Sequence, residues 1–193
     1  MSQRNNSPKK ILWLTSALFI GILSYVAPQV TSLITQHVPA AEPGYHKVVS
    51  FADGDTITVD MNGQHEKVRM IGVDTPEKNH PDKPKQCYST QASQFTKNKI
   101  VAAGTVVRLE ADPLNDPRDR YNRLLRYVYL RDGTLLNKQL VSEGYGFAYT
   151  LYPFAKTTEF TEAHTQAQTA MKGLWQHCQA TKKGNSWSTN STP

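Results

Sequence analysis

Between residues 45 and 129 the sequence alternates short β-rich segments with tight-turn signals, and this pattern limits the possible fold more than any other feature. Asp53-Gly54 and Asn62-Gly63 are two of these signals, and Asn-Gly favours a two-residue hairpin. Along several segments apolar and polar residues alternate, as they do in strands that bury one face. The predicted strands are 45–51, 56–59, 68–73, 105–111 and 125–129.

Helical patterns follow the first three strands and return near the end of the chain. One covers 89–103, and the others cover 135–143 and 157–172. Five short strands within about 90 residues favour a closed barrel over a doubly wound sheet. The sequence has neither the βαβ alternation of a Rossmann fold nor a glycine-rich phosphate loop. We therefore predict a five-stranded β-barrel with about three α-helices, in the α+β class.

The N-terminus carries an uncharged apolar run, residues 11–27, which is preceded by Arg4, Lys9 and Lys10. A basic flank before such a run is typical of a secretory signal or a signal-anchor, with residues 1–10 in the cytoplasm. The length of the run suits a short membrane span or a long signal-peptide core. We expect the rest of the chain to be extracytoplasmic, anchored to the cell membrane, or secreted if it is cleaved near Ala40.

Composition divides the remaining chain into three parts. Residues 28–44 contain three prolines and are predicted to be a linker, 45–178 the folded domain, and the polar residues 179–193 a disordered tail. The formal net charge is +6, of which 1–44, 45–178 and 179–193 contribute +2 each. Net charge is therefore weak evidence for a nucleic-acid partner, and the positions of the charges within the domain matter more.

Cys87 and Cys178 are the two cysteines of the chain. In an oxidising compartment they can pair and close a loop of 91 residues. The chain-entropy model gives such a bridge about 4–5 kcal/mol of stabilisation. Two free thiols are the alternative, and a zinc site is disfavoured because there is no CxxC motif and no cluster of histidines. We favour the disulfide.

Carboxylates gather at two turns that flank neighbouring strands. Asp53 and Asp55 precede the second strand, and Asp74, Thr75 and Glu77 follow the third. Hairpin-linked strands would bring the turns together into an oxygen-rich cluster of Asp55, Asp74 and the Thr75 carbonyl. Ca²⁺ takes oxygen ligands of this kind. For either motif alone, ordinary turn chemistry is the competing interpretation.

Arginines accompany these carboxylates. Arg69 lies on the strand that leads into Asp74, and four more arginines crowd into 118–126. The planar guanidinium binds phosphate oxygens bidentately. Beside a metal site, arginines of this kind can neutralise the charge that develops during phosphodiester hydrolysis, while a free carboxylate activates water. The competing interpretation of 118–126 is a solvated loop salt-bridged to Asp116 and Asp119.

Three sequence strings carry a resemblance to a known family: DGDT at 53–56, VRMIGVDTPE at 68–77 and DRYNRLL at 119–125. In this order and at this spacing they resemble the thermonuclease, or staphylococcal nuclease-like, family. The similarity extends from about Tyr45 to Trp175. One departure is Asn122, where the family usually has glycine, although asparagine tolerates a left-handed backbone better than most residues do.

The resemblance implies an OB-fold barrel and a Ca²⁺-dependent nuclease that acts on DNA and RNA and leaves 3′-phosphate ends. We expect its catalytic domain to be monomeric. The resemblance implies calcium ligation for Asp55, Asp74 and the Thr75 carbonyl, and support of that site for Asp53. It implies general-base catalysis or water positioning for Glu77. It also implies phosphate binding for Arg69 and Arg123, and substrate contact for Tyr121. Tyr149 and Tyr152 resemble the family's nucleotide-side tyrosines, at a spacing that differs by about one residue, and bases would stack on them without regard to sequence.

A non-catalytic OB-fold module that binds single strands or proteins is the alternative function. Such modules typically lack the acidic and arginine positions, whereas Asp55, Asp74, Glu77, Arg69 and Arg123 are all present here. An anchored structural or adhesion domain, a third class, would not need these side chains together. The sequence therefore favours an exported, metal-dependent nuclease.

Overall fold

The computed structural model describes residues 44–78 and 84–191. The predicted cytoplasmic segment 1–10, the apolar run 11–27, the cleavage position near Ala40 and the linker up to residue 43 lie outside the described residues. Within the described part of the chain, no helix is both long and apolar enough to cross a membrane.

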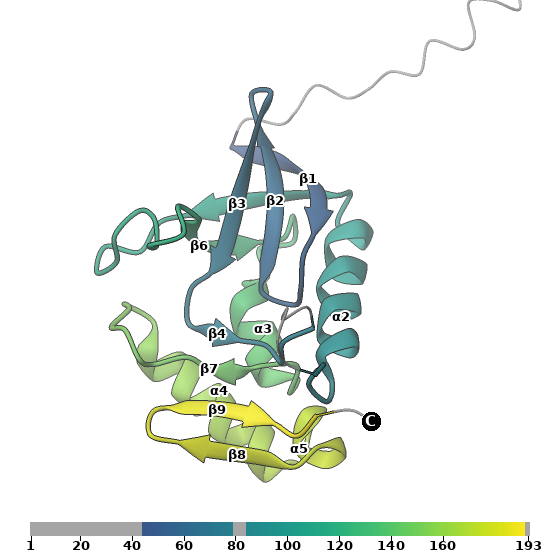
Figure 1. The fold of residues 1–193 in the computed structure, drawn as a ribbon. Helices are drawn as coiled ribbons and strands as arrows, with labels where there is room; N and C mark the ends of the chain where they lie inside the picture. The colour runs from purple at the N-terminus through teal and green to yellow at the C-terminus, as the bar shows by residue number, and fades with distance from the viewer. Residues whose placement is uncertain (1–43, 79–83, 192–193) are drawn as a thin grey trace, which may run out of the picture. The chain divides into compact units, whose positions relative to one another are not determined.

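Five strands close into a barrel in the order β1-β2-β3-β6-β5 (Figure 1). All neighbouring pairs are antiparallel except β3 and β6, which run parallel. The predicted Asn62-Gly63 hairpin joins β2 to β3, and both residues adopt the positive φ that such a turn requires. The strands are β1 (Tyr45–Phe51), β2 (Thr56–Met61), β3 (Gln64–Met70), β5 (Val106–Glu110) and β6 (Leu124–Tyr129).

Helices pack against the side of the barrel and at one of its ends. In Figure 1, α2 runs beside β1, and α3 contacts both β6 and α4. The five-stranded barrel and the three longer helices confirm the predicted α+β class. The helices are α2 (Ser89–Ala102), α3 (Leu136–Ser142), α4 (Thr157–Thr169) and the short α5 (Leu174–His177), and a small sheet pairs β4 (Val73–Asp74) with β7 (Phe147–Ala148).

The barrel interior is filled by aliphatic side chains that alternate along the strands. Ile57 and Val59 of β2 and Val68 of β3 are fully buried, as are Val107 of β5 and Val128 of β6. Burying a side chain of this size contributes about 1.5–3 kcal/mol. The buried residues of β3, Val68 and Met70, follow the predicted alternation, whereas β6 buries the consecutive residues Tyr127 and Val128.

The predicted strand 68–73 is interrupted in the structure, because β3 ends at Met70 and β4 begins at Val73. Gly72 lies between them with a φ of +76°, and a Cβ at this position would come within 2.8 Å of the Phe154 ring. Buried Asn137 holds the break by donating to the Ile71 carbonyl at 2.9 Å. The bend carries Asp74 out of the barrel sheet.

The prediction of a disordered tail is wrong for the residues after 179, which form an antiparallel hairpin of β8 (Ala180–Lys183) and β9 (Ser186–Thr189). Trp187 anchors this hairpin by stacking on Phe147 at 5.7 Å and meeting Trp175 edge-on at 5.2 Å. The average composition of the segment is polar, but one large aromatic side chain and a two-residue Gly-Asn turn are enough to order it. The folded domain therefore extends beyond the predicted boundary at 178.

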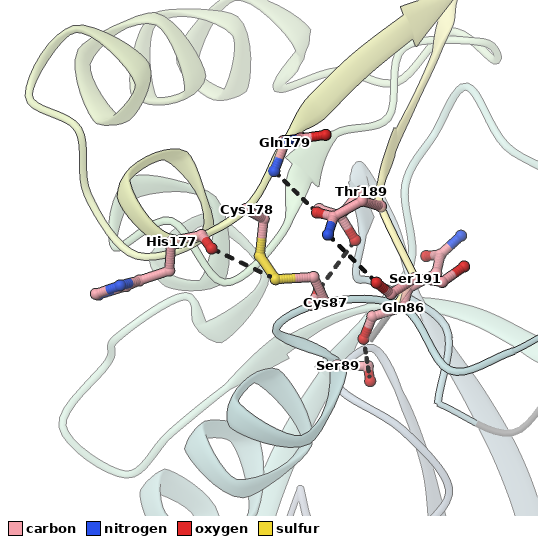
Figure 2. The surroundings of a disulfide bond; sticks show 9 residues. Gln86, Cys87, Ser89, His177, Cys178, Gln179, Thr189 and Ser191 are labelled. Atoms are coloured by element: carbon pink, nitrogen blue, oxygen red, sulfur yellow. Dashed lines mark hydrogen bonds between the residues drawn. A yellow bond between two sulfur atoms is a disulfide. The ribbon is translucent and has the colours of Figure 1, made fainter. Parts of the chain in front are cut away.

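The favoured disulfide is present between Cys87 and Cys178 (Figure 2). Hydrogen bonds surround it: the Thr189 hydroxyl donates to the Cys87 carbonyl at 2.9 Å, and the Cys87 amide donates to the Asn190 carbonyl at 2.8 Å. The bridge therefore ties the segment before α2 to the base of the hairpin. A disulfide of this kind is typical of proteins in an oxidising, extracytoplasmic compartment.

Replacing both cysteines with serine should lower the free energy of unfolding by up to about 4–5 kcal/mol, because the unfolded chain regains the entropy of a 91-residue loop. Urea unfolding of the oxidised protein and of the Cys87→Ser/Cys178→Ser variant measures the difference. The unaltered protein in reductant is the matched control and should resemble the variant. Equal stability of all three would contradict a stabilising role for the bridge.

Candidate active site

A cavity of about 470 Å³ opens between the loop that precedes β6 and the loop that joins β7 to α4. Acidic, basic and aromatic side chains share its lining, together with Ser186 of the C-terminal hairpin. Of the residues singled out from the sequence, the cavity brings together Arg69, Asp74, Tyr121, Arg123, Tyr149 and Tyr152.

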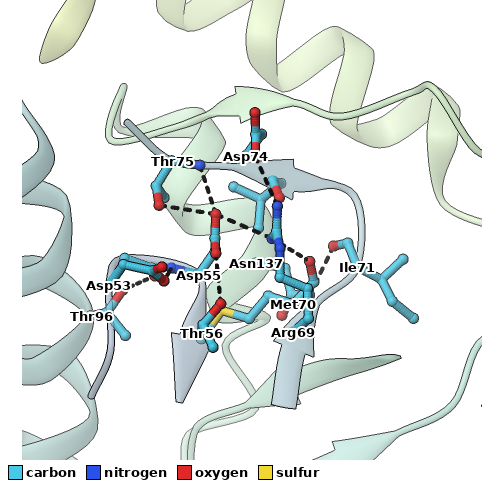
Figure 3. A network of polar contacts seen from close by, with 12 residues as sticks. Asp53, Asp55, Thr56, Arg69, Met70, Ile71, Asp74, Thr75, Thr96 and Asn137 are labelled. Atoms are coloured by element: carbon cyan, nitrogen blue, oxygen red, sulfur yellow. Dashed lines mark hydrogen bonds and ion pairs between the residues drawn. The ribbon is translucent and has the colours of Figure 1, made fainter. Parts of the chain in front are cut away.

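Asp55 is not among the residues that line the cavity, and its side chain joins the two acidic turns (Figure 3). One of its carboxylate oxygens accepts hydrogen bonds from the Thr75 amide at 2.8 Å and the Thr75 hydroxyl at 2.9 Å. The other oxygen accepts a hydrogen bond from the Thr56 hydroxyl at 3.0 Å. Asp55 is buried, and both of its carboxylate oxygens are hydrogen-bonded. Asp53 closes the turn by accepting from the Asp55 amide at 3.2 Å.

Arg69 projects from β3 between two of these carboxylates. Its Nη1 lies 3.1 Å from an oxygen of Asp55, and its Nη2 lies 2.8 Å from an oxygen of Asp74. Nη1 also donates to the Val73 carbonyl at 2.7 Å. The guanidinium is thus held by Asp55 from the turn before β2 and by Val73 and Asp74 of β4. The Arg69 side chain is 13 % exposed.

Negative charge is crowded around Arg69. Burial raises the pKa of the Asp53 carboxyl to about 7, and the neighbouring Asp55 carboxylate adds to the shift. Burial likewise raises the pKa of Asp74 to about 6, although the Arg69 guanidinium opposes the change. Glu77 lies close enough for its charge to raise both pKa values further. Four acidic side chains therefore share the field of one arginine.

The donor chemistry of this cluster fits a hard cation. Asp55 and Asp74 carry carboxylate oxygens and Thr75 a backbone carbonyl, which are the ligand types that Ca²⁺ binds. Within residues 44–78 and 84–191, no three acidic, histidine or cysteine side chains converge at metal-ligand distances. The Arg69 guanidinium instead lies between the carboxylates of Asp55 and Asp74 and pairs with both.

Glu77 is half-buried and is not among the residues that line the cavity. Gln86 clamps its backbone: the Glu77 amide donates to the Gln86 side-chain oxygen at 2.7 Å, and the Gln86 amide donates to the Glu77 carbonyl at 3.0 Å. The sequence does not reveal the role of Gln86, because nothing in the pattern of 78–88 pairs two positions nine residues apart.

Arg123 is positioned by Asp119, which the sequence analysis considered only as a salt-bridge partner in a solvated loop. One Asp119 oxygen lies 2.7 Å from the Arg123 Nε, and the other accepts from the Arg123 amide at 2.9 Å. Asn122 adopts a φ of +63°, so the turn keeps the left-handed backbone that glycine would provide. The exposed Tyr121 ring lies 5.4 Å from the Arg123 guanidinium.

The other arginines of 118–126 have structural partners. Arg118 makes two parallel bonds to Glu66 of β3, at 2.8 and 2.9 Å. Arg126 donates to the Pro117 carbonyl at 3.0 Å. These contacts pin the loop to the barrel, so that Arg123 projects toward the cavity from a fixed support.

Asp112 joins the two loops that flank the cavity. Its carboxylate accepts hydrogen bonds from the Leu114 amide at 2.7 Å, from the Ala155 amide at 2.8 Å and from the buried Tyr127 hydroxyl. Burial acts to raise the pKa of Asp112, but the hydrogen bonds from Tyr127, Ala155 and Leu114 outweigh it and hold the pKa below its usual value. Asn115 adds a second link between the loops by donating to the Pro153 carbonyl at 3.0 Å.

An OB-fold barrel with an acidic cluster and arginines at one cavity is the architecture that the sequence resemblance implied. The family model described as "Staphylococcal nuclease homologue" matches residues 67–177, so the chain belongs to the staphylococcal nuclease family. It is 43 % identical to the thermonuclease of Staphylococcus hyicus over 131 residues, which are 67 % of this chain and 75 % of that protein.

Two further relatives extend the comparison. The thermonuclease of Staphylococcus intermedius is 42 % identical over 125 residues, which are 64 % of this chain and 71 % of that protein. Endonuclease YncB of Bacillus subtilis is 38 % identical over 125 residues, which are 64 % of this chain and 57 % of that protein.

Changing Asp112 to asparagine should destabilise the protein by about 1–3 kcal/mol at neutral pH, because it removes an acceptor from buried donors. Since the native pKa of Asp112 is lowered, its contribution is present above the unfolded pKa of about 3.9 and is lost as the pH falls through the native pKa. Unfolding free energies measured from pH 7 to pH 3 should therefore converge for the two proteins at low pH. The exposed Asp116→Asn is the matched control, and a parallel offset at every pH would contradict this account.

Proposed function

We propose that this protein is a Ca²⁺-dependent nuclease that hydrolyses phosphodiester bonds of DNA and RNA and leaves 3′-phosphate ends. The observation that carries the proposal is that Arg123 lines the same cavity as Arg69 and Asp74 although it comes from a distant segment of the sequence. The thermonucleases and the endonuclease among its relatives support a nuclease function.

The side chains divide the chemistry between them. Asp55, Asp74 and the Thr75 carbonyl would hold the Ca²⁺, with Asp53 supporting Asp55. The ion, when bound, would polarise the scissile phosphate. Arg69 and Arg123 would bind the phosphate oxygens and stabilise the charge that accumulates in the transition state. Glu77 would accept a proton from the attacking water or hold that water in line.

Aromatic side chains at the cavity suit a single-stranded substrate. The rings of Tyr149 and Tyr152 lie 6.1 Å apart, and Tyr121 and Tyr152 are exposed. Bases would stack on such rings without sequence preference. The same exposed tyrosines also favour the second candidate, a module that binds single strands without cleaving them.

The location proposed for the enzyme follows from the N-terminal sequence and the disulfide. Residues 11–27 would anchor the protein to the cell membrane with 1–10 in the cytoplasm, or cleavage near Ala40 would release it. Either route delivers the catalytic domain, as a monomer, to an oxidising compartment where Cys87 and Cys178 pair.

Incubation of the purified full chain with single-stranded DNA, in Ca²⁺ or in chelator, tests the proposal. Cleavage in Ca²⁺ alone, with 3′-phosphate ends on the products, is the expected result. Binding without cleavage by oxidised protein would assign the chain to the binding-module class. Cleavage that persists in chelator would refute the metal requirement.

Glu77→Gln should lower kcat by about 10²–10⁴-fold and leave the affinity for DNA nearly unchanged, because it removes a base and no phosphate contact. Turnover and the dissociation constant, the latter measured in chelator, separate the two effects. Glu159→Gln, an exposed change on α4, is the control. Equal losses of turnover and affinity would exclude the general-base role.

Arg123→Lys keeps the charge but loses the planar fork, and we expect kcat to fall on the order of 10²-fold. Arg126→Lys makes the same change three residues later, at a side chain bonded to Pro117 and outside the cavity lining. It should retain most activity. Near-normal turnover of Arg123→Lys would mean that Arg123 does not contact the scissile phosphate.

A further inference from the structure

The C-terminal hairpin reaches the cavity although it lies outside the residues that the family model matches. That match ends at residue 177, and the hairpin begins at Ala180. Ser186, the first residue of β9, is part of the cavity lining with Tyr149 and Tyr152. In Figure 1 the turn of the hairpin lies on the same side of the molecule as the loop between β7 and α4. This segment therefore adds Ser186 to a cavity whose other lining residues lie within or close to the residues that the family model matches.

The hairpin is held firmly at its base and along one face. The Cys87–Cys178 bridge precedes it, and the Gln179 amide donates to the Asn190 side chain at 2.9 Å, where the two strands meet (Figure 2). Trp187 packs into the aromatic cluster below. The turn is therefore presented to the cavity as a preorganised surface.

Two lysines flank this turn. Lys183 lies directly across the hairpin from the cavity-lining Ser186, and Lys182 lies across from Trp187 with its ammonium 5.8 Å from the ring. Both lysines are exposed. Neither takes part in an ion pair among the residues that the structure describes. Lys183 therefore shares a strand face with the cavity-lining Ser186, Lys182 shares the opposite face with Trp187, and neither lysine itself lines the cavity. Ammonium groups without an acidic partner on the hairpin next to the cavity are suited to the phosphates of a polyanion.

We propose that the hairpin extends the nucleic-acid-binding surface, with Lys182 and Lys183 binding backbone phosphates of a single strand beyond the bond that is cut. The inference rests on the proposed nuclease function and adds a subsite to it. Phosphate contacts of this kind carry no base specificity, but they favour strands long enough to reach the hairpin.

Equilibrium binding of the full chain to a single-stranded oligothymidylate of about 12 nucleotides, in chelator, tests the subsite apart from cleavage. For single strands each phosphate contact contributes about 0.7 to the slope of log K against log salt, so Lys182→Ala/Lys183→Ala should reduce that slope by about 1.4. At low salt the affinity should fall about tenfold. The ratio of affinities for the oligonucleotide and for a dinucleotide should fall by the same factor.

Lys97→Ala/Lys99→Ala removes the same charge from α2, away from the C-terminal hairpin, and should keep the slope. Lys182→Arg/Lys183→Arg should keep it too, which separates charge from folding of the hairpin. Equal effects of the two alanine pairs, no effect of the hairpin pair, or no measurable binding by the unaltered chain would each overturn the proposal. Failure to cleave, with the slope change present, would refute the nuclease function and leave the subsite standing.

Discussion

The two-sided ion pair of Arg69 with Asp55 and Asp74 is the contact on which the rest of the site depends. Arg69 lies beside the turn of Asp55 because β2 and β3 form one hairpin, and Asp74 returns to Arg69 because the chain bends at Gly72. A buried charge that loses its partner costs several kcal/mol, whereas a buried pair adds little net stability. The cluster is therefore better understood as a device that fixes geometry than as a source of stability. Its carboxylates outnumber its arginine, and their mutual repulsion adds to the effect of burial in raising the pKa of Asp53 and Asp74.

Carboxylates have a second role around the cavity, because they hold the loops that carry the arginines. Asp119 orients Arg123 through both its side chain and its backbone amide, and Glu66 pins Arg118 to the barrel. Asp112 ties the loop before β6 to the loop after β7. The crowded arginines of 118–126 therefore have two roles, support of the loop and lining of the cavity, and Arg118 has both. A charge count along the sequence cannot separate these two roles.

Contacts around the disulfide make the C-terminal hairpin part of the folded domain. The bridge and the hydrogen bond from the Cys87 amide to Asn190 join it to the segment before α2, whose Gln86 also clamps the backbone of Glu77. Trp187 joins it to β7 by stacking on Phe147. A change at the base of the hairpin could therefore reach the acidic cluster through a short chain of direct contacts. Residues in this region form the disulfide, hold the backbone of Glu77 and contribute Ser186 to the cavity lining.

The sequence by itself determined the barrel, the three main helices and the short strings that hold the acidic and arginine side chains, because periodic burial and turn residues are local properties. It also favoured the disulfide between Cys87 and Cys178. Tertiary structure decided which side chains meet: that Arg69 lies between Asp55 and Asp74, that Gln86 holds Glu77, and that Asp119 rather than solvent engages Arg123. It decided as well that the polar tail is a hairpin, because Trp187 finds partners in β7 and α5. Contacts between residues far apart in the chain leave no periodic trace in the sequence, so only the folded chain reveals them.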